Sequence, residues 1–242
     1  MRRPKTLGLL LPVLGALLQA SPAGAWVRSR TTGCHAVYWP TSCVYIQPDS
    51  LLTDDMTPAD AKRQIQQAMA AWQDLTTGSY LKLNFVEPDG VREARYDKQP
   101  VIKFRTGKWC RPGDCAGDKE TCYDASAAAI TTVFFVNKPE DAVQDGMILD
   151  ADIEMNNVNN IFFDADGAAP ISDGRSLADL RNTLVHELGH LQGLEHTCRA
   201  SANDGTPECT MDEAGQRPPL CSAAIAGAAR GDTKSQQIVE TT

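Results

Sequence analysis

The chain has 242 residues, with 31 acidic against 23 basic side chains and a formal net charge of −8 at pH 7. Such an acidic balance argues against nucleic-acid binding, which needs basic patches. The length suits one domain with a proper hydrophobic core, and we find no internal repeat.

Residues 1–25 have the features of a secretory signal peptide. A basic start is followed by an apolar run over residues 6–18 and by small residues that end at Ala25. The run is too short to form a stable membrane anchor, so we expect cleavage after Ala25 and a secreted, extracellular protein with no membrane span. Cleavage removes three basic groups and no acidic ones, which changes the net charge from −8 to −11.

The first predicted elements are an extended segment over residues 26–42, a short strand at residues 44–46 and a helix. The helix start is marked by a Thr57 cap, Pro58 at the first helical position and Asp60 three residues after the cap. We expect this helix to run to about residue 75 and to end at Gly78. Its apolar face would carry Ile65, Ala68, Met69 and Trp72.

Four further strands are predicted from apolar and alternating patterns, at residues 80–86, 101–105, 129–136 and 147–155. In the last of them, apolar residues alternate with Asp150, Asp152 and Glu154. A polar loop over residues 156–174 precedes Ser176–Asp179, which we expect to cap a second long helix. The core stripe of that helix is predicted to be Leu177, Leu180, Leu184, Leu188 and Leu191.

A short Ala-rich helix is expected at residues 222–229, followed by a mobile polar tail at residues 231–242. The order of elements predicts an α+β fold: a twisted mixed sheet of four to five strands backed by two long helices. The domain is expected to span residues 26–230.

Three of the four histidines fall within eleven residues, in the pattern H-E-x-x-H-x-x-G-x-x-H over residues 186–196. His186 and His190 are four apart, so a helix projects both from one face. Gly193 can adopt a left-handed conformation, which ends the helix and brings His196 back as a third ligand. Three histidine ligands leave one position of a tetrahedral Zn²⁺ open, which is the catalytic arrangement.

Glu187 follows the first histidine and is the candidate general base for a metal-activated water. The alternative interpretation is an ordinary amphipathic helix with surface histidines. The fixed offsets of the glycine and the third histidine favour the metal site.

Eight cysteines in an exported chain predict disulfides, although 105 pairings are possible. Spacing favours Cys34–Cys43 and Cys198–Cys209. The cluster of Cys110, Cys115 and Cys122 leaves one cysteine to reach elsewhere, with Cys221 as a candidate, and a zinc knuckle is the alternative for this cluster.

The zinc motif resembles the matrixin form H-E-x-G-H-x-x-G-L-x-H of the metzincin clan, and the likeness covers roughly residues 43–230. The resemblance implies a zincin-like fold whose active-site helix carries the motif, and a Met-turn beneath the metal, for which Met211 is the candidate. The sequence differs from the matrixin pattern at two points. Thr197 stands where matrixins usually have Ser, and the segment after Met211 matches the matrixin specificity loop poorly. With only His35 left over, a second, structural zinc is not expected. Cys34 lacks the neighbours of a cysteine switch, so control by a thiolate propeptide is not expected either.

The resemblance implies a secreted zinc endopeptidase that holds one catalytic Zn²⁺ on His186, His190 and His196. Glu187 would act as general base, and the strand at residues 147–155 resembles the edge strand that binds an extended peptide by strand addition. A plain sheet edge blunted by acidic residues is the alternative for that strand.

We expect a monomer acting on protein or peptide substrates. The alternative functions are a zinc hydrolase of cell-wall peptides and a catalytically weak zinc-containing binding protein. Asp164, Asp166 and Asp173 could hold Ca²⁺, although their loop does not fit the EF-hand pattern and could simply be solvated.

Overall fold

The computed structural model describes residues 27–73, 80–113, 117–212 and 214–229. The predicted signal peptide, the predicted helix end at Gly78 and the predicted polar tail lie outside these residues. Among the helices of the described part, none is long and apolar enough to cross a membrane.

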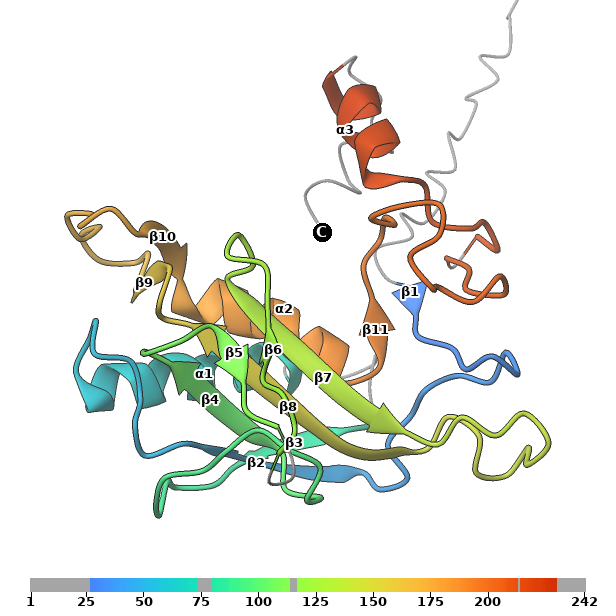
Figure 1. The fold of residues 1–242 in the computed structure, drawn as a ribbon, viewed down its shortest axis with the longest axis horizontal. Helices are drawn as coiled ribbons and strands as arrows, with labels where there is room; N and C mark the ends of the chain where they lie inside the picture. The colour runs from blue at the N-terminus through green and yellow to red at the C-terminus, as the bar shows by residue number, and fades with distance from the viewer. Residues whose placement is uncertain (1–26, 74–79, 114–116, 213, 230–242) are drawn as a thin grey trace, which may run out of the picture.

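A mixed five-stranded sheet forms the centre of the described part (Figure 1). In spatial order its strands are β3 (Lys82–Phe85), β2 (Cys43–Pro48), β4 (Val101–Arg105), β8 (Ile148–Asn156) and β7 (Ala129–Phe135). The first four are parallel, whereas β7 is antiparallel to β8 and forms an edge of the sheet. The structure therefore confirms the predicted mixed sheet and the positions of its strands.

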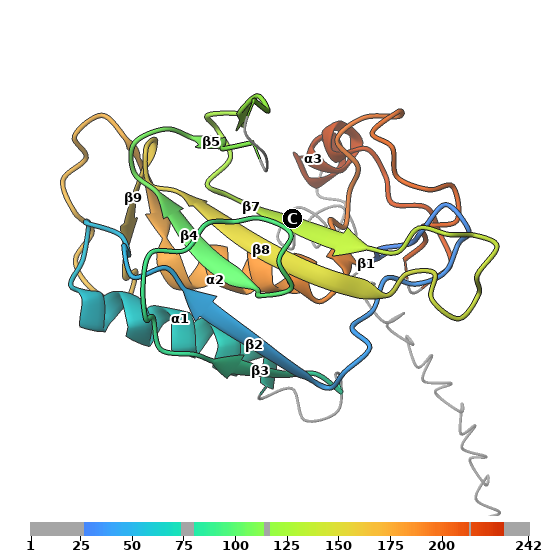
Figure 2. The same ribbon diagram turned by 60° about the horizontal axis from the view of Figure 1, so that its bottom comes forward.

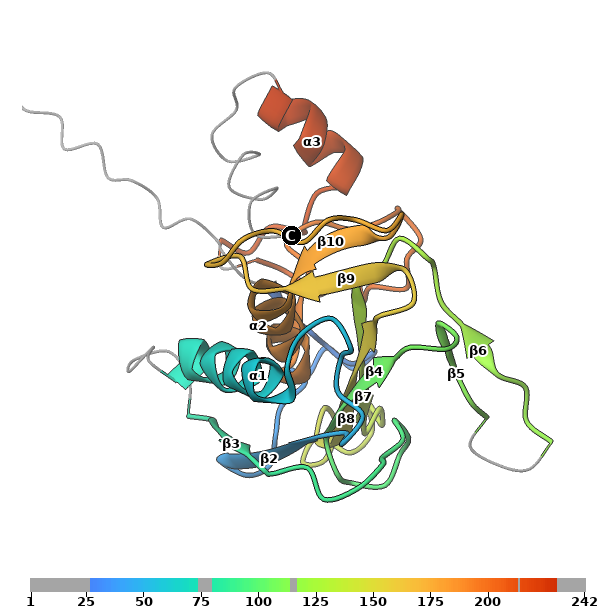
Figure 3. The ribbon, with the colours of Figure 1, turned by 90° about the vertical axis from the view of Figure 1, so that its left-hand side faces the viewer.

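Two helices, α1 (Pro58–Gln73) and α2 (Leu180–Leu191), pack against each other on one face of the sheet (Figures 2 and 3). The predicted start of α1 is confirmed, because the Asp60 backbone N–H donates to Thr57 Oγ1 over 3.2 Å. The core lies between helices and sheet; the fully buried side chains of α2 are Leu180, Leu184, Leu188 and Leu191. A third helix, α3 (Cys221–Ala229), occupies the predicted Ala-rich segment.

The start of α2 differs from the prediction. Ser176–Asp179 form a strand, β10, which pairs in parallel with β9 (Asn160–Phe163) inside the segment expected to be a loop. Strand pairing keeps this backbone extended, so the helix begins only after Asp179, whose side chain accepts a hydrogen bond from the Asn182 N–H. Leu177 therefore does not belong to the core stripe, and 42% of its surface is exposed.

The prediction that residues 147–155 form the edge strand was wrong, because β8 lies between β4 and β7. Its acidic residues are buried. Both interpretations of the strand, as a peptide-binding edge or as an edge blunted by acidic residues, would leave these side chains exposed. Glu154 accepts hydrogen bonds from Arg105 and Arg111, and Asp150 accepts from the backbone N–H groups of Asp97 and Lys98 at 2.8 and 2.6 Å. These partners compensate the loss of hydration, so an alternating pattern that usually indicates exposure is found in the interior.

Asp152 is the least compensated of these acids. Its Oδ1 accepts from the Val101 N–H, but its buried Oδ2 has no hydrogen-bond partner. Burial, together with the negative charge of Asp150, raises the pKa of Asp152 to about 8.

This pKa predicts a loss of stability with rising pH. An unfolded Asp releases its proton near pH 4, so between about pH 4 and 8 the folded state binds more protons and the free energy of unfolding falls as pH rises. Asp152→Asn removes this titration and should raise the free energy of unfolding at pH 8 by about 1–3 kcal/mol. Denaturant unfolding of both proteins at pH 5 and pH 8 checks this; equal pH slopes would contradict it.

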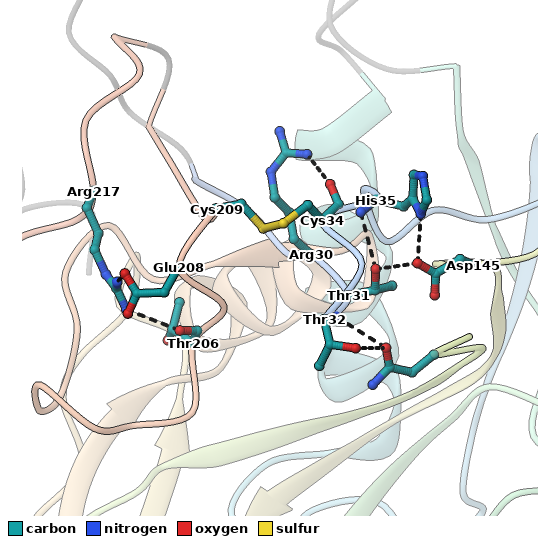
Figure 4. The surroundings of a disulfide bond; sticks show 11 residues. Arg30, Thr31, Thr32, Cys34, His35, Asp145, Thr206, Glu208, Cys209 and Arg217 are labelled. Atoms are coloured by element: carbon teal, nitrogen blue, oxygen red, sulfur yellow. Dashed lines mark hydrogen bonds and ion pairs between the residues drawn. A yellow bond between two sulfur atoms is a disulfide. The ribbon is translucent and has the colours of Figure 1, made fainter. Parts of the chain in front are cut away.

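The N-terminal segment is held against the end of α2. β1 (Val27–Arg28) pairs antiparallel with β11 (Leu194–Glu195), and the Ser29 N–H donates to Gly193 O over 2.9 Å. Thr31 Oγ1 and His35 Nδ1 both contact Asp145 Oδ2, which ties the same segment to the loop before β8 (Figure 4). The predicted extended segment thus connects two parts of the chain that lie far apart in sequence.

The disulfides differ from those that spacing favoured. Cys34 bonds Cys209 across 175 residues (Figure 4). Cys198 bonds Cys221, while Cys43 is free and exposed. The pairing of β1 with β11 explains the first bond, because it carries the N-terminal segment to the C-terminal loop. Cys34 also adopts a positive φ of 69°.

The third disulfide, Cys110–Cys122, joins the short strands β5 (Cys110–Arg111) and β6 (Thr121–Cys122). It excludes the zinc knuckle, since bonded sulfurs cannot serve as thiolate ligands. Cys221 bonds Cys198 and not a member of this cluster, and Cys115 lies outside the described residues.

Candidate metal centre

Helix α2 presents His186 and His190 from one face because its leucine stripe fixes the opposite face in the core. The turn after the helix depends on Gly193, whose φ is 84°. A Cβ at this position would lie 2.7 Å from Val37 O, so the site requires glycine for space as well as for conformation. The predicted left-handed turn is confirmed, and it leads through β11 to His196.

The three histidines converge on one point. Their Nε2 atoms lie 3.1 Å (His186 to His190), 3.1 Å (His186 to His196) and 3.0 Å (His190 to His196) apart. Three nitrogens about 2.0–2.1 Å from a tetrahedral zinc are separated by about 3.3 Å, so this group has the size that zinc requires. Among the described residues it is one of two groups that could hold a metal ion, and the other contains the disulfide of Cys110 and Cys122.

The electrostatics of the site keep these imidazoles available as ligands. His190 Nδ1 lies 2.8 Å from Leu194 O, which requires the proton on Nδ1 and leaves the lone pair of Nε2 facing the other histidines. Burial and the neighbouring His190 lower the pKa of His186; burial, His190 and His186 lower the pKa of His196 to about 4. Both rings are therefore neutral at physiological pH, the form that binds metal.

Glu187 is buried beside the histidines, with 5% of its surface exposed. Its Oε2 accepts a hydrogen bond from Thr131 Oγ1 of β7 over 2.6 Å. Burial raises the pKa of Glu187, and the bond from Thr131 opposes that rise. A carboxyl group whose pKa is raised, beside a candidate metal site, is suited to general acid–base chemistry.

A cleft of about 1020 Å³ runs between the edge strand β7 and the helix α2. The three histidines, Glu187 and the inner face of β7 line it, as do Ser29, Val37 and Trp72. The sequence pattern did not identify Ser29, Val37 or Thr131 as part of the site. Thr131 could have been noticed as a hydroxyl in an otherwise apolar row, but alternation alone does not show which face of the strand meets the motif.

The three candidate calcium ligands do not come together in one group. Asp164, Asp166 and Asp173 pair with three different arginines, Arg63, Arg181 and Arg175. They belong to neither of the two ligand groups found in the described part of the chain. The solvated, ion-paired loop is the interpretation that these contacts support.

Met211 does not line the cleft, and 36% of its surface is exposed. Such exposure argues against a methionine packed beneath the histidines. The loop expected to be closed by Cys198 and Cys209 is instead tied at each end to other segments, by Cys221 and by Cys34.

The structure combines a mixed sheet, two helices on one of its faces, and three convergent histidines that could hold a metal ion. The sequence model of the family Peptidase_M10, described as Matrixin, matches residues 46–203, which is more than half of the chain. The chain therefore belongs to the matrixin family, whose members are zinc metalloproteases. No curated protein sequence gives a match.

Proposed function

We propose that the protein is a secreted zinc-dependent endopeptidase in which His186, His190 and His196 hold one Zn²⁺. The observation that supports this most strongly is the triangle of Nε2 atoms 3.0–3.1 Å apart. When bound there, zinc would supply Lewis-acid chemistry, polarising the scissile carbonyl and acidifying water. Residues 26–230 would form the catalytic domain behind a signal peptide of residues 1–25, with residues 231–242 as a tail. Three disulfides fit an oxidising, extracellular location.

Glu187 is proposed as the general base. Its carboxylate takes the proton of the attacking water and passes it to the nitrogen of the leaving amine, so that both proton transfers use one residue. The buried position of Glu187 strengthens its electrostatic interactions with the reacting groups.

The edge strand β7 is proposed to bind the substrate. It borders the cleft and pairs with β8 on one side, so the backbone groups of its other side can pair with an extended peptide. Strand addition explains how one cleft accepts a polypeptide, with main-chain bonds giving affinity and side-chain pockets giving selectivity.

The proposed activity is tested by incubating the purified chain, starting at Trp26, with casein and a mixed peptide library. Cleavage should stop with a zinc chelator and return when stoichiometric zinc is added. Purified peptidoglycan, treated in parallel, distinguishes a hydrolase of cell-wall peptides. If the protein binds one zinc per chain but cleaves no peptide or protein, the proposal of an endopeptidase is wrong.

A further inference from the structure

Thr131 is the one polar side chain on the face of β7 that points toward the core. On β7, Ala129, Val133 and Phe135 pack against the hydrophobic core beneath the helices. Thr131 shares their face by alternation, and β7 packs directly against α2. A hydroxyl at this position is therefore turned toward the helix that carries Glu187.

The hydroxyl has two acceptors on one residue. Thr131 Oγ1 lies 2.6 Å from Glu187 Oε2 and 3.1 Å from the Glu187 backbone oxygen. A hydroxyl carries a single hydrogen, so it donates to one of these oxygens at a time. The shorter contact, to a carboxylate oxygen, is the stronger one, because hydrogen bonds to charged acceptors are shorter and stronger than neutral ones.

We propose that Thr131 is a positioning residue that orients the carboxylate of Glu187 for proton transfer, an inference that rests on the proposed function of Glu187. Fixing Oε2 fixes the plane of the carboxylate, and with it the direction in which Oε1 points. Orientation of a catalytic group matters because small errors in its placement cost large factors in rate.

The same contact can be kept throughout the reaction. A hydroxyl accepts as well as donates, so once Glu187 carries the transferred proton, Thr131 can accept from Oε2. Its own hydrogen then turns to the Glu187 backbone oxygen, the second acceptor 3.1 Å away. This exchange requires a hydroxyl, and neither a methyl group nor a main-chain amide can provide it.

Thr131→Val tests the proposal, because it replaces the hydroxyl by a methyl group of similar size. We expect kcat to fall about 10- to 100-fold, the effect of losing one hydrogen bond to a charged group, while KM changes less than about twofold. Thr131→Ser keeps the hydroxyl and should retain kcat within about threefold. Thr121→Val makes the same exchange on the exposed strand β6 and should leave kcat unchanged.

Zinc content and the thermal midpoint, measured on each variant, separate positioning from folding. If Thr131→Val loses zinc or unfolds, the test rests on Thr131→Ser compared with the parent. A Thr131→Ser variant that keeps its zinc and thermal midpoint but loses tenfold or more in kcat would show that the hydroxyl is not what matters. In a Glu187→Gln background, Thr131→Val should add less than about a twofold loss, since its effect passes through Glu187. A further tenfold loss, or an unchanged kcat in the single variant, would overturn the proposal.

The failure of this inference can be distinguished from the failure of the proposed function. If Glu187→Gln retains the parental rate, the role of Glu187 as general base is wrong. If Glu187→Gln abolishes cleavage but Thr131→Val does not slow it, the base assignment stands and only the positioning role of Thr131 is wrong.

Discussion

Glu187→Gln is expected to reduce kcat by about 10²–10⁴-fold while the chain keeps its zinc, because an amide cannot accept the proton of the attacking water. Gln has the size of Glu and can still receive the hydrogen bond from Thr131, so the fold should persist. The measurement is kcat on a peptide substrate together with zinc content after desalting. Glu120→Gln, at an exposed position directly before β6, provides the matched control and should cleave at the parental rate.

Two results would contradict the base assignment. One is a Glu187→Gln variant that cleaves at the parental rate. The other is a variant that is inactive only because it has lost its zinc, which would make Glu187 important for metal binding and not for proton transfer.

Removing the disulfide between Cys34 and Cys209 should lower the free energy of unfolding by about 2–5 kcal/mol. The bond closes a loop of 175 residues, and on the chain-entropy account long loops give the largest effects. It also fixes the N-terminal segment, whose strand β1 pairs with β11, the strand directly before His196 (Figure 1). The variant Cys34→Ser/Cys209→Ser is therefore expected to bind zinc more weakly as well.

Denaturant unfolding and a zinc titration with a competing chelator measure the two effects. Cys43→Ser removes a free, exposed thiol and should change the free energy of unfolding by less than about 0.5 kcal/mol. An unchanged unfolding midpoint in the double variant would show that the long-range bond does not stabilise the domain. A lower midpoint with unchanged zinc affinity would show that the N-terminal segment does not support His196.

The convergence of the three histidines was predictable from the sequence because the spacing of the motif is local. His186 and His190 follow from helical periodicity, and Gly193 follows from the need for a left-handed turn, which the φ of 84° confirms. The strands and the first helix were predictable for the same reason: alternation and capping act within a few residues.

The features that could not be predicted from the sequence depend on contacts between residues that are far apart in the chain. The alternation in β8 indicated a half-exposed strand, but Asp150 is buried against backbone amides of a distant loop and Glu154 against the arginines of β4 and β5. The bond of Cys34 to Cys209 follows from the pairing of β1 with β11, which no spacing rule contains. Thr131 became recognisable only when the position of β7 beside α2 was known.

The proposed centre is one metal held by three imidazoles, and X-ray absorption at the zinc edge of the loaded protein measures this directly. We expect one zinc per chain with nitrogen or oxygen ligands at about 2.0–2.1 Å, three of them histidine, and loss of that signal in His196→Ala. Sulfur ligands at about 2.3 Å, or an unchanged spectrum in His196→Ala, would contradict it.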